Sequence, residues 1–286
     1  MKTIKANNLI CPIDGEKLSL NEKQLICENG HSYDVARQGY VNLLPVQHKR
    51  SKHPGDSKEM VVARTNFLSS GVYEPIAKKL AEVTSLYLDN QNETCLMDAG
   101  CGEGYYFDYL FKSLQNSDCT NECSFIGLDI SKFAIIDAAK KNKNITWIVG
   151  TNRQPPVENK SVDVIMCVFG FHSFEGFKSI LKDNGKIILV EPGTEHLKEL
   201  RDIIYSEVKV TEPPDLSVAK ELGLSLIDTQ KLKFKTGKIS NLEINQLLLM
   251  TPHFFRANKQ GQIAAAELQE IDLTVDVIFR VLENTT

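Results

Sequence analysis

LMDAGCGEGYY, residues 96–106, is the stretch of sequence that decides the fold of this chain. The order of residue types is typical of a buried strand that ends in a glycine turn and is followed by a helix. Gly100, Gly102 and Gly104 alternate with other residues, and glycine lets a backbone turn sharply and approach a ligand where a Cβ would collide with it. The stretch therefore predicts a cofactor-binding turn between a strand and a helix.

The acidic residues around these glycines indicate which kind of ligand the turn holds. Asp98 precedes the glycines and Glu103 lies among them. A phosphate-binding loop relies on exposed backbone N–H groups and a lysine and avoids carboxylates, so a cationic or hydroxyl-bearing ligand fits this turn better. The pattern Asp-x-Gly-x-Gly-x-Gly resembles the first motif of the Rossmann-like S-adenosylmethionine-dependent methyltransferases, in which the glycines approach the amino-acid part of the cofactor.

Length and composition set the outer limits of the prediction. A chain of 286 residues holds one large α/β domain, or one of moderate size with a small appendage. The net charge of −4 does not mark a nucleic-acid binder, although it leaves room for a local basic patch. No apolar run approaches the roughly 20 residues of a membrane span, and the start of the chain lacks a signal-peptide core. We expect a cytoplasmic protein without a membrane partner.

The first 40 or so residues are too few and too polar to fold on an ordinary core, so another element must hold them. Cys11 begins one tight turn, and Cys27 and His31 bracket a second, after a hairpin return. Asp14 stands where a Cys-x-x-Cys pair would place its second thiolate. Sulfur, imidazole and carboxylate are zinc ligands, so the pattern predicts a Cys-Asp-Cys-His zinc site. The alternative is a pair of relic turns without metal. The odd total of seven cysteines also argues for reduced thiols or metal ligands rather than disulfides.

A basic segment follows this pair of turns. Lys49, Arg50 and Lys52 form the densest positive patch in the first part of the chain, and Tyr33 and Tyr40 precede it. Positive charge beside aromatic rings suits an RNA backbone with bases to stack, so we predict that these three cations bind RNA. A solvated charged surface is the alternative.

The rest of the chain alternates strands and helices in the manner of a doubly wound parallel sheet. Two helices, broken around Gly71, are predicted within residues 57–88. The predicted strands are 94–98, 124–129, 146–149, 161–169 and 185–193, and the predicted helices between and after them are 105–114, 131–140 and 195–207. A reversed strand pair, 224–235 and 271–282, surrounds a helix at 241–250, and the alternating pattern of the last strand favours the edge of the sheet.

Fold logic places further residues at the cofactor. Asp129 ends a strand where Rossmann-like folds present an acid to ribose hydroxyls, and a carboxylate accepts two hydrogen bonds from a diol. Asn152 follows the next strand and would border the adenine, unless it forms an ordinary Asx turn. Residues 169–172 end a buried strand and point towards the reaction centre. DNA amino-methyltransferases carry an Asn/Asp-Pro-Pro-aromatic motif at this position. Residues 169–172 lack that motif, which disfavours methylation of an exocyclic amine.

A wider resemblance covers nearly the whole chain. The two turns with Cys11 and Cys27, together with six further segments, resemble the bacterial 23S ribosomal RNA (guanine-N1)-methyltransferases, which modify a hairpin loop of the large subunit. The segments are GYVNLLPVQHKRSKHPGDSKEM, ARTNFLSSGVYEPI, DAGCGEGYY, GLDISKFAI, EPGTEHLKELRDIIY and MTPHFFRA. The resemblance implies a zinc-binding RNA-recognition domain, a catalytic domain and a homodimer. It also implies that Tyr73 and His196 contact the cofactor, and that Asp14 replaces a zinc-binding cysteine.

These inferences combine into one hypothesis. The fold is α/β, a Rossmann-like class I methyltransferase sheet with a small N-terminal zinc-ribbon-like domain, divided as residues 1–45, a basic linker at 46–60 and a methyltransferase domain at 61–286. The enzyme moves a methyl group from S-adenosylmethionine to N1 of a guanine in a 23S rRNA hairpin. The alternative is an S-adenosylmethionine-binding protein or small-molecule methyltransferase without rRNA activity. The predicted cofactor-binding residues are Tyr73, Asp98, Gly100, Gly102, Glu103, Asp129, Asn152 and His196.

The general base is the least determined part of the hypothesis. Guanine N1 carries a proton, which a base must remove or water must accept as the new bond forms. Glu103, His172, Glu175 and His196 lie near the predicted strand ends, and the sequence does not choose among them. His172 and Glu175 are the candidates not already assigned to the cofactor.

Overall fold

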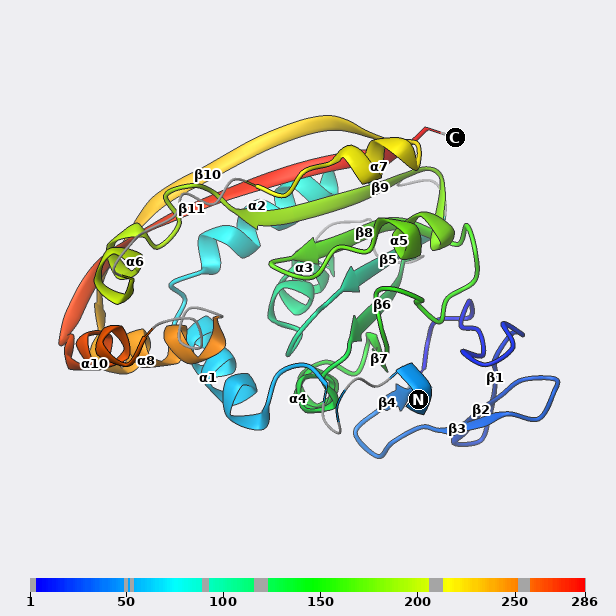
Figure 1. Cartoon of the computed structure of the whole chain (residues 1–286). Helices are drawn as coiled ribbons and strands as arrows, with labels where there is room; N and C mark the ends of the chain where they lie inside the picture. The colour runs from blue at the N-terminus through cyan, green and yellow to red at the C-terminus, as the bar shows by residue number, and fades with distance from the viewer. Residues whose placement is uncertain are drawn as a thin grey trace.

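The computed structural model describes residues 4–48, 51, 54–88, 93–115, 123–205, 213–251 and 258–285, and within them an eight-stranded sheet forms the centre of the molecule (Figure 1). Its strand order is β10-β11-β9-β8-β5-β6-β7-β4. The strands are β4 (Tyr40–Asn42), β5 (Thr94–Ala99), β6 (Cys123–Asp129), β7 (Thr146–Val149), β8 (Val162–Val168), β9 (Leu181–Pro192), β10 (Leu224–Ser240) and β11 (Glu270–Asn284). The predicted RNA-binding residues Lys49, Arg50 and Lys52 lie outside the described residues.

The middle of the sheet is parallel, as the sequence predicted. Strands β4 to β9 pair in parallel, whereas β11 runs antiparallel to both of its neighbours, β9 and β10. Such a sheet, with one reversed strand, is the class I methyltransferase arrangement that was expected. Strand β5 lies at the centre and is buried on both faces, so the glycine turn that follows it emerges in the middle of one edge.

The predicted position of the last strand was wrong. Strand β11 lies inside the sheet between β9 and β10, and the edge is β10. From Leu273 onwards most side chains of β11 are buried, and those at alternate positions from Leu273 to Val281 pack in one apolar cluster with residues of the helices. Along β10, Lys231, Lys233 and Lys235 recur at alternate positions and stay largely exposed, which is typical of an edge strand protected from further pairing.

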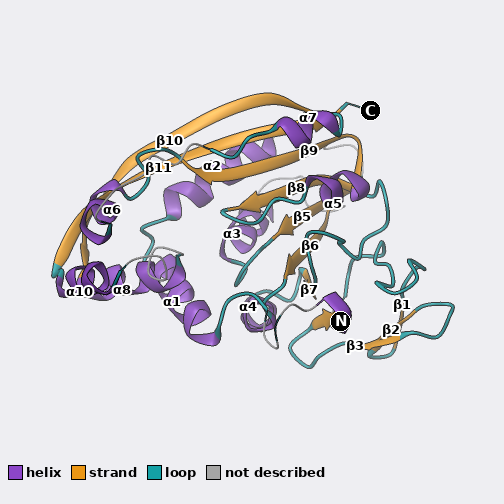
Figure 2. Ribbon diagram, viewed as in Figure 1, coloured by secondary structure: helices purple, strands orange, loops and turns teal. Residues whose placement is uncertain are grey.

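The helices cover both faces of the sheet (Figure 2). They are α1 (Lys58–Ser69), α2 (Glu74–Ser85), α3 (Tyr105–Gln115), α4 (Lys132–Lys141), α5 (Phe174–Ile180), α6 (Lys198–Ile204), α7 (Ser217–Glu221), α8 (Asn241–Met250) and α10 (Lys259–Glu267). Residues of α1 to α4, α6 and α8 belong to one apolar cluster, and residues of α5 and α7 belong to the cluster on the other face. None of the helices within the described ranges is long and apolar enough to cross a membrane.

Helix α6 is shorter than the predicted helix at 195–207. Leu197 adopts a left-handed conformation with φ 54°, so the helix begins only at Lys198, and His196 lies in the preceding turn. The helix ends at Ile204, where Tyr205 is already extended. The prediction of a break near Gly71 is confirmed, because α1 ends at Ser69 and α2 begins at Glu74.

The N-terminal segment forms a small sheet of its own and also joins the large one. Strands β1 (Ser19–Asn21), β2 (Gln24–Ile26) and β3 (Ser32–Asp34) form an antiparallel meander. Strand β4 then pairs with β7 at the edge of the large sheet, and a short 3₁₀ turn, η1 (Val46–His48), follows. The N-terminal segment is therefore attached to the large sheet by backbone hydrogen bonds as well as by side-chain packing.

Candidate active site

A cavity of about 1200 Å³ opens at the carboxyl ends of β5 to β9. Ligands of open parallel sheets bind at this edge, where loops of neighbouring strands diverge. Of the residues predicted from sequence, the cavity is lined by Tyr73, Asp98, Gly100, Gly102, Glu103, Asp129, Asn152, His172 and His196. Glu175 is exposed on α5 and is not among the lining residues. The structure therefore brings most of the predicted residues together at this cavity, and it places the catalytic candidate Glu175 outside it.

The glycine turn takes the conformation that its residues allow. Gly100, Gly102 and Gly104 all have positive φ, at 93°, 56° and 83°. A Cβ at Gly104 would lie 2.7 Å from the Trp147 ring, so this glycine lets helix α3 begin against the sheet. A Cβ at Gly100 would meet nothing closer than 3.7 Å, so that position faces open space. Gly100 thus leaves room for a ligand, and Gly104 serves packing.

Asp98 presents a carboxylate that has no partner on one side. The residue is 1% exposed, and its Oδ1 accepts no hydrogen bond from the described residues. Burial and, secondarily, the charge of Asp129 raise the pKa of Asp98 to about 8. A buried acceptor without a donor is costly, and a cation in the cavity would offset that cost. Asp98 is therefore suited to a cationic ligand.

Asp129 is held in one orientation by the turns on either side. Its Oδ2 accepts the N–H of Gly102 at 2.9 Å, and its Oδ1 accepts the N–H of Ser131 at 2.7 Å. Burial raises the pKa of Asp129, and these two N–H groups oppose the shift. Each carboxylate oxygen keeps a free lone pair, so the fixed carboxylate can accept both hydroxyls of a ribose.

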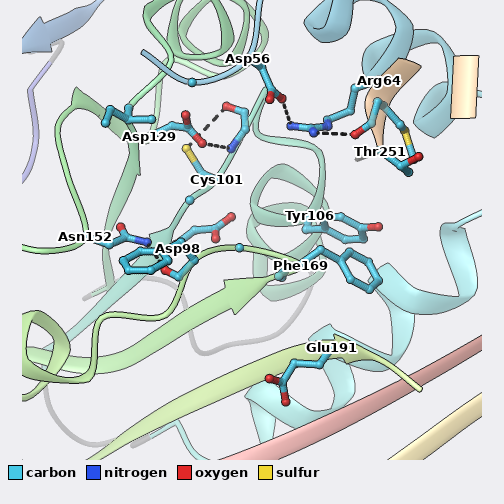
Figure 3. A pocket seen from close by; sticks show the side chains of 18 of the residues that line it. Asp56, Arg64, Asp98, Cys101, Tyr106, Asp129, Asn152, Phe169, Glu191 and Thr251 are labelled. Atoms are coloured by element: carbon cyan, nitrogen blue, oxygen red, sulfur yellow. Dashed lines mark hydrogen bonds and ion pairs between the residues drawn. The ribbon is translucent and has the colours of Figure 1, made fainter. Parts of the chain in front are cut away.

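Glu103 and Asn152 differ in whether their polar side-chain atoms have partners among the described residues. Glu103 is buried and forms an ion pair with Lys141 of α4, so its charge is compensated within the protein. The Asn152 side chain donates through Nδ2 to the carbonyl oxygen of Phe171 at 2.9 Å, while its Oδ1 is buried without a partner among the described residues. Asn152 therefore offers an acceptor to a ligand amino group (Figure 3).

Tyr73 and His196 meet across the cavity from distant parts of the chain. The Asp276 N–H donates to His196 Nδ1 at 3.3 Å, which assigns the imidazole proton to Nε2. Nε2 lies 3.4 Å from the Tyr73 hydroxyl, whose pKa is raised by burial. The Tyr73 hydroxyl thus accepts from His196 and keeps its own proton available as a donor.

Several cavity residues were missed from sequence. Arg64 of α1 forms an ion pair with Asp56 at 2.5 Å and donates to the Met250 carbonyl oxygen at 3.0 Å. Its Nη1 lies 3.2 Å from where a Gly102 Cβ would be, so this cation borders the glycine turn (Figure 3). The sequence carried a usable signal in the ARTNFLSSGVYEPI segment, where Arg64 stands one turn before Phe67 and Leu68, two buried residues of α1. Glu191 and Arg201 also line the cavity and were not predicted.

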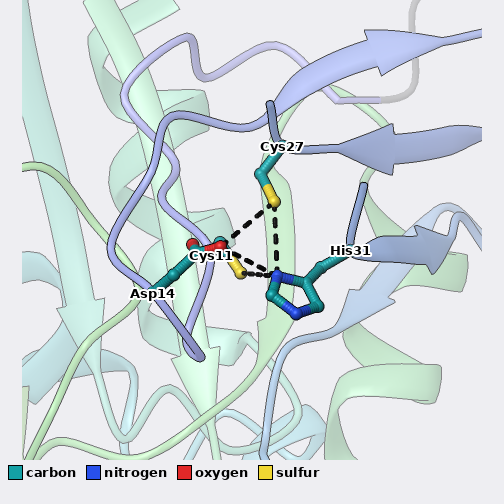
Figure 4. A group of neighbouring side chains, drawn as sticks. All are labelled: Cys11, Asp14, Cys27 and His31. Atoms are coloured by element: carbon teal, nitrogen blue, oxygen red, sulfur yellow. Dashed lines mark hydrogen bonds and ion pairs between the residues drawn. The ribbon is translucent and has the colours of Figure 1, made fainter. Parts of the chain in front are cut away.

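A second cluster of polar groups lies in the N-terminal meander (Figure 4). One ligand atom from each of Cys11, Asp14, Cys27 and His31 lies within 4.8 Å of all the others. His31 Nδ1 is 2.8 Å from Asp14 Oδ2, 3.5 Å from Cys27 Sγ and 3.6 Å from Cys11 Sγ. The two nitrogen–sulfur separations match the edges of a tetrahedron around zinc, for which bonds of about 2.0 to 2.3 Å are typical, whereas the shorter nitrogen–oxygen separation is that of a hydrogen bond. The four predicted ligands therefore fit a zinc ion.

Two tight turns and an outer partner shape this cluster. The Gly15 N–H donates to the Cys11 carbonyl oxygen, and the Gly30 N–H donates to the Cys27 carbonyl oxygen, which closes the two predicted turns. The Tyr33 hydroxyl lies 3.1 Å from Cys11 Sγ. Hydrogen bonds to ligand atoms orient them for a metal, so Tyr33 supports the cluster from outside.

Comparison with known proteins gives matches for both parts of the chain. The family described as "RlmA, N-terminal", a zinc ribbon, matches residues 9–52, and the family described as "Methyltransferase domain" matches residues 96–188. The 23S rRNA (guanine(748)-N(1))-methyltransferase of Streptomyces fradiae is 30% identical over 278 residues, which cover 96% of this chain and 95% of that protein.

Two further relatives have names that describe the same kind of reaction. A protein of Bacillus subtilis, provisionally named 23S rRNA (guanine-N(1)-)-methyltransferase YxjB, is 28% identical over 286 residues, covering 96% of this chain and 97% of its own length. A protein of Micromonospora griseorubida with the same provisional name, without the gene symbol, is 31% identical over 232 residues, or 75% of each chain.

Proposed function

Because the chain belongs to the 23S rRNA (guanine-N1)-methyltransferase family, we propose that it transfers a methyl group from S-adenosylmethionine to N1 of a guanine in a hairpin loop of 23S rRNA. The observation that carries this proposal is the cavity at the strand ends, which joins a ligand-facing glycine turn to acidic and amide groups with open acceptor atoms. The cofactor supplies a methyl group already activated on a sulfonium centre, so the protein chiefly has to align the acceptor nitrogen with it.

The cofactor is held by residues at the ends of β5, β6 and β7. Asp98 balances its positive charge, and Gly100 and Gly102 allow close approach of the amino-acid part, beside the buried Glu103. Asp129 accepts the ribose hydroxyls. The other proposed cofactor contacts are Asn152, at the adenine, and Tyr73 with His196, at the methionine end.

The N-terminal segment selects the RNA. Zinc at Cys11, Asp14, Cys27 and His31 holds the N-terminal domain of residues 1–45 together. The basic residues Lys49, Arg50 and Lys52, in the linker at 46–60, contact RNA phosphates. The methyltransferase domain then spans 61–286. Action on ribosomal RNA supports a cytoplasmic location, and the family resemblance supports a homodimer.

The experiment uses purified protein, S-adenosylmethionine with a labelled methyl group, and deproteinised 23S rRNA from a strain that lacks this modification. We expect transfer to one guanine, identified as 1-methylguanine by nuclease digestion with mass spectrometry and by the stop it causes in reverse transcription. Absence of label from rRNA, with cofactor bound normally, would contradict the proposal.

A second candidate function is a small-molecule methyltransferase or cofactor-binding protein, and Asp14 is the observation that favours it. A carboxylate in place of a thiolate weakens the zinc site on which RNA recognition depends. Replacement of Lys49, Arg50 and Lys52 by alanine separates the two functions. An rRNA methyltransferase should lose RNA affinity and show a shallower dependence on salt, because phosphate contacts are removed. An unchanged affinity would favour the second candidate.

A further inference from the structure

The cavity is larger than the cofactor requires. Pockets that hold one small molecule usually enclose about 300 to 1000 Å³, and this one encloses about 1200 Å³. The proposed cofactor residues come from the ends of β5, β6 and β7. The remaining wall consists of the loop after β8, the end of β9 and the start of α6, where Phe169, His172, Glu191 and Arg201 face the cavity. This second part has room for the acceptor base.

Glu191 is the charged group with an open acceptor in this second part. It lies at the carboxyl end of β9 and is 2% exposed. Arg280 of β11 holds its Oε2, with Nε at 2.6 Å and Nη2 at 2.5 Å. Its Oε1 accepts no hydrogen bond from the described residues, and His172 Nδ1 lies 3.6 Å from it. A buried carboxylate oxygen without a donor indicates that a ligand provides one.

The guanidinium beside Glu191 is itself fixed. Arg280 donates through Nη1 to the carbonyl oxygen of Pro214 at 2.9 Å, which prevents it from turning away. With Oε2 engaged by two guanidinium nitrogens, the carboxylate is held in place and Oε1 stays available to a donor. A group held in this way is preorganised, so it loses little entropy when a ligand donates to it.

An aromatic residue of the neighbouring strand end lines the same cavity, and its backbone N–H donates to the Val190 carbonyl oxygen, next to Glu191 in the chain. Phe169 has φ 51°, a left-handed conformation that is strained for a bulky residue and that often marks a functional position. The rings of His196, Tyr106 and Tyr73 lie around it, with centroids 5.8, 6.4 and 6.5 Å away, and 39% of Phe169 stays exposed (Figure 3). The strand end therefore presents a supported ring on which a base can stack.

We propose that Glu191 is the catalytic residue that recognises the target guanine and removes its N1 proton, with Phe169 stacking on the base. This inference rests on the proposed function. Guanine presents two adjacent donors on its Watson–Crick edge, N1–H and the 2-amino group. The open Oε1 of Glu191 has two lone pairs, so this one oxygen can accept from both. Adenine presents an acceptor at N1, which a carboxylate repels, so the same group selects the base and acts on it.

The reaction balances with Glu191 as base. The N1 proton passes to the carboxylate, and its bonding pair remains on N1 in the plane of the ring. Because the methyl group must approach along that same direction, proton removal precedes methyl transfer. The N1–C bond then forms as the S–C bond breaks, and sulfur keeps the pair of that bond. The products are 1-methylguanine, S-adenosylhomocysteine and a proton on Glu191, which water removes.

The other candidate bases are less suited to this step. Burial, together with the charge of Arg280, lowers the pKa of His172 to about 4, which makes it a weak proton acceptor near neutral pH. Burial raises the pKa of Glu191, and Arg280 opposes that shift. A raised pKa makes a carboxylate a better base while the neighbouring cation keeps it ionised. Glu175 does not line the cavity.

The test compares Glu191→Gln with Glu283→Gln. Glu283 is also a glutamate paired with a cation across β9 and β11, but it contacts Lys186 at the opposite end of the strands. Each protein, bound to S-adenosylmethionine, is given a hairpin with guanine or inosine at the mapped position, and single-turnover methyl transfer is measured. Inosine keeps N1–H but lacks the 2-amino group. Cofactor affinity and melting temperature are measured in parallel, which separates folding defects from catalytic ones.

We expect Glu191→Gln to slow transfer to guanine by at least about 100-fold, with cofactor affinity within about threefold of the unsubstituted protein. The preference of the unsubstituted protein for guanine over inosine should fall towards one in this variant, whereas Glu283→Gln should keep both rate and preference. Transfer by Glu191→Gln within threefold of the original rate, or an undiminished guanine preference, would overturn the assignment of Glu191 and leave the proposed function standing. No transfer by the unsubstituted protein to any guanine would overturn both.

Discussion

The N-terminal metal cluster and the active-site cavity both gather polar groups from distant residues, but they leave those groups in different states. In the cluster, the ligand atoms of Cys11, Asp14, Cys27 and His31 face one another within 4.8 Å. In the cavity, Asp98 Oδ1 and Glu191 Oε1 are buried and accept no hydrogen bond from the part of the chain that the structure describes. A single small ion completes the first arrangement, whereas the second needs large ligands with donors of their own. Ligand atoms that converge on one point, as in the cluster, therefore indicate a metal ion. Separate acceptor atoms without donors, as in the cavity, indicate organic substrates.

The two regions also differ in what holds them together. Strands β1 to β3 have three residues each and are mostly exposed, so little apolar surface supports the meander. The large sheet is buried between two extensive apolar clusters. Loss of metal should therefore affect the meander far more than the sheet.

The largest effect is expected for Cys27→Ser, which removes a thiolate from the cluster. Metal content should fall from one ion per chain to nearly none, and amides of the meander should exchange rapidly while those of β5 and β8 stay protected. Elemental analysis and hydrogen exchange measure the two results. Cys123→Ser, a matched change at a cysteine outside the cluster, should keep the metal. Full metal retention by Cys27→Ser would break the contrast between the regions.

Asp98→Asn should weaken cofactor binding by about 30-fold or more, because the positive charge of the ligand loses a buried counter-charge. Calorimetric titration with S-adenosylmethionine measures the change. Titration with S-adenosylhomocysteine, which lacks the sulfonium charge, is the control and should show a smaller loss. An equal loss for both ligands would mean that Asp98 acts through shape rather than charge.

The same substitution should change how stability depends on pH. The pKa of Asp98 is about 8 in the folded protein, against an ordinary value of 3.8. Between these values the unfolded chain releases the proton and the folded protein keeps it, so the unfolding free energy declines as pH rises from about 4 to about 8, by at most about 1.4 kcal/mol per pH unit. Urea unfolding at pH 5, 6.5 and 8 should show a shallower decline for Asp98→Asn. Parallel curves for the two proteins would contradict the buried, unpaired state of Asp98.

Asp14→Cys should strengthen zinc binding by about tenfold or more, since a thiolate binds zinc more tightly than a carboxylate in this setting. Competition with a chromophoric chelator measures both affinities. The change keeps four ligands that converge from the same two turns, so the meander itself should keep its structure. A weaker affinity in the variant would show that the geometry here is fitted to the carboxylate.

The smallest expected effect concerns the contact between the metal cluster and the active-site cavity. The Ile10 N–H donates to the Pro156 carbonyl oxygen at 3.1 Å, and the Glu158 N–H donates to the Asn8 carbonyl oxygen at 2.8 Å. These bonds join the first metal-binding turn to the loop that carries Asn152. Removal of metal with a chelator should therefore weaken cofactor binding by about threefold. No change would mean that the loop is held by the sheet alone.

The sequence predicted the elements that depend on local patterns. Strand β7 and helix α8 have the predicted bounds, Thr146–Val149 and Asn241–Met250. Ser131, with which the predicted helix at 131–140 begins, caps α4 through a hydrogen bond from the Ala134 N–H. The four metal ligands were found because their spacing within two short turns fixes their meeting. In each case the determining residues lie within about one turn or one hairpin of one another.

The missed features depend on contacts between distant residues. Glu191 meets Arg280 only because β11 pairs with β9, and nothing in either segment specifies that neighbour. The edge position expected for β11 was wrong for the same reason, since an alternating strand fits an edge or an interior position until its partners are known. Arg64 likewise reaches the glycine turn through the packing of α1 against α8.

One measurement tests the acceptor site most directly: a crystal structure of the protein with S-adenosylhomocysteine and the hairpin that contains the mapped guanine. We expect the base to lie on Phe169, with its N1 and 2-amino nitrogens within about 3 Å of the Glu191 carboxylate. A guanine whose Watson–Crick edge faces any other residue, with Glu191 Oε1 still unpartnered, would contradict the assignment of Glu191.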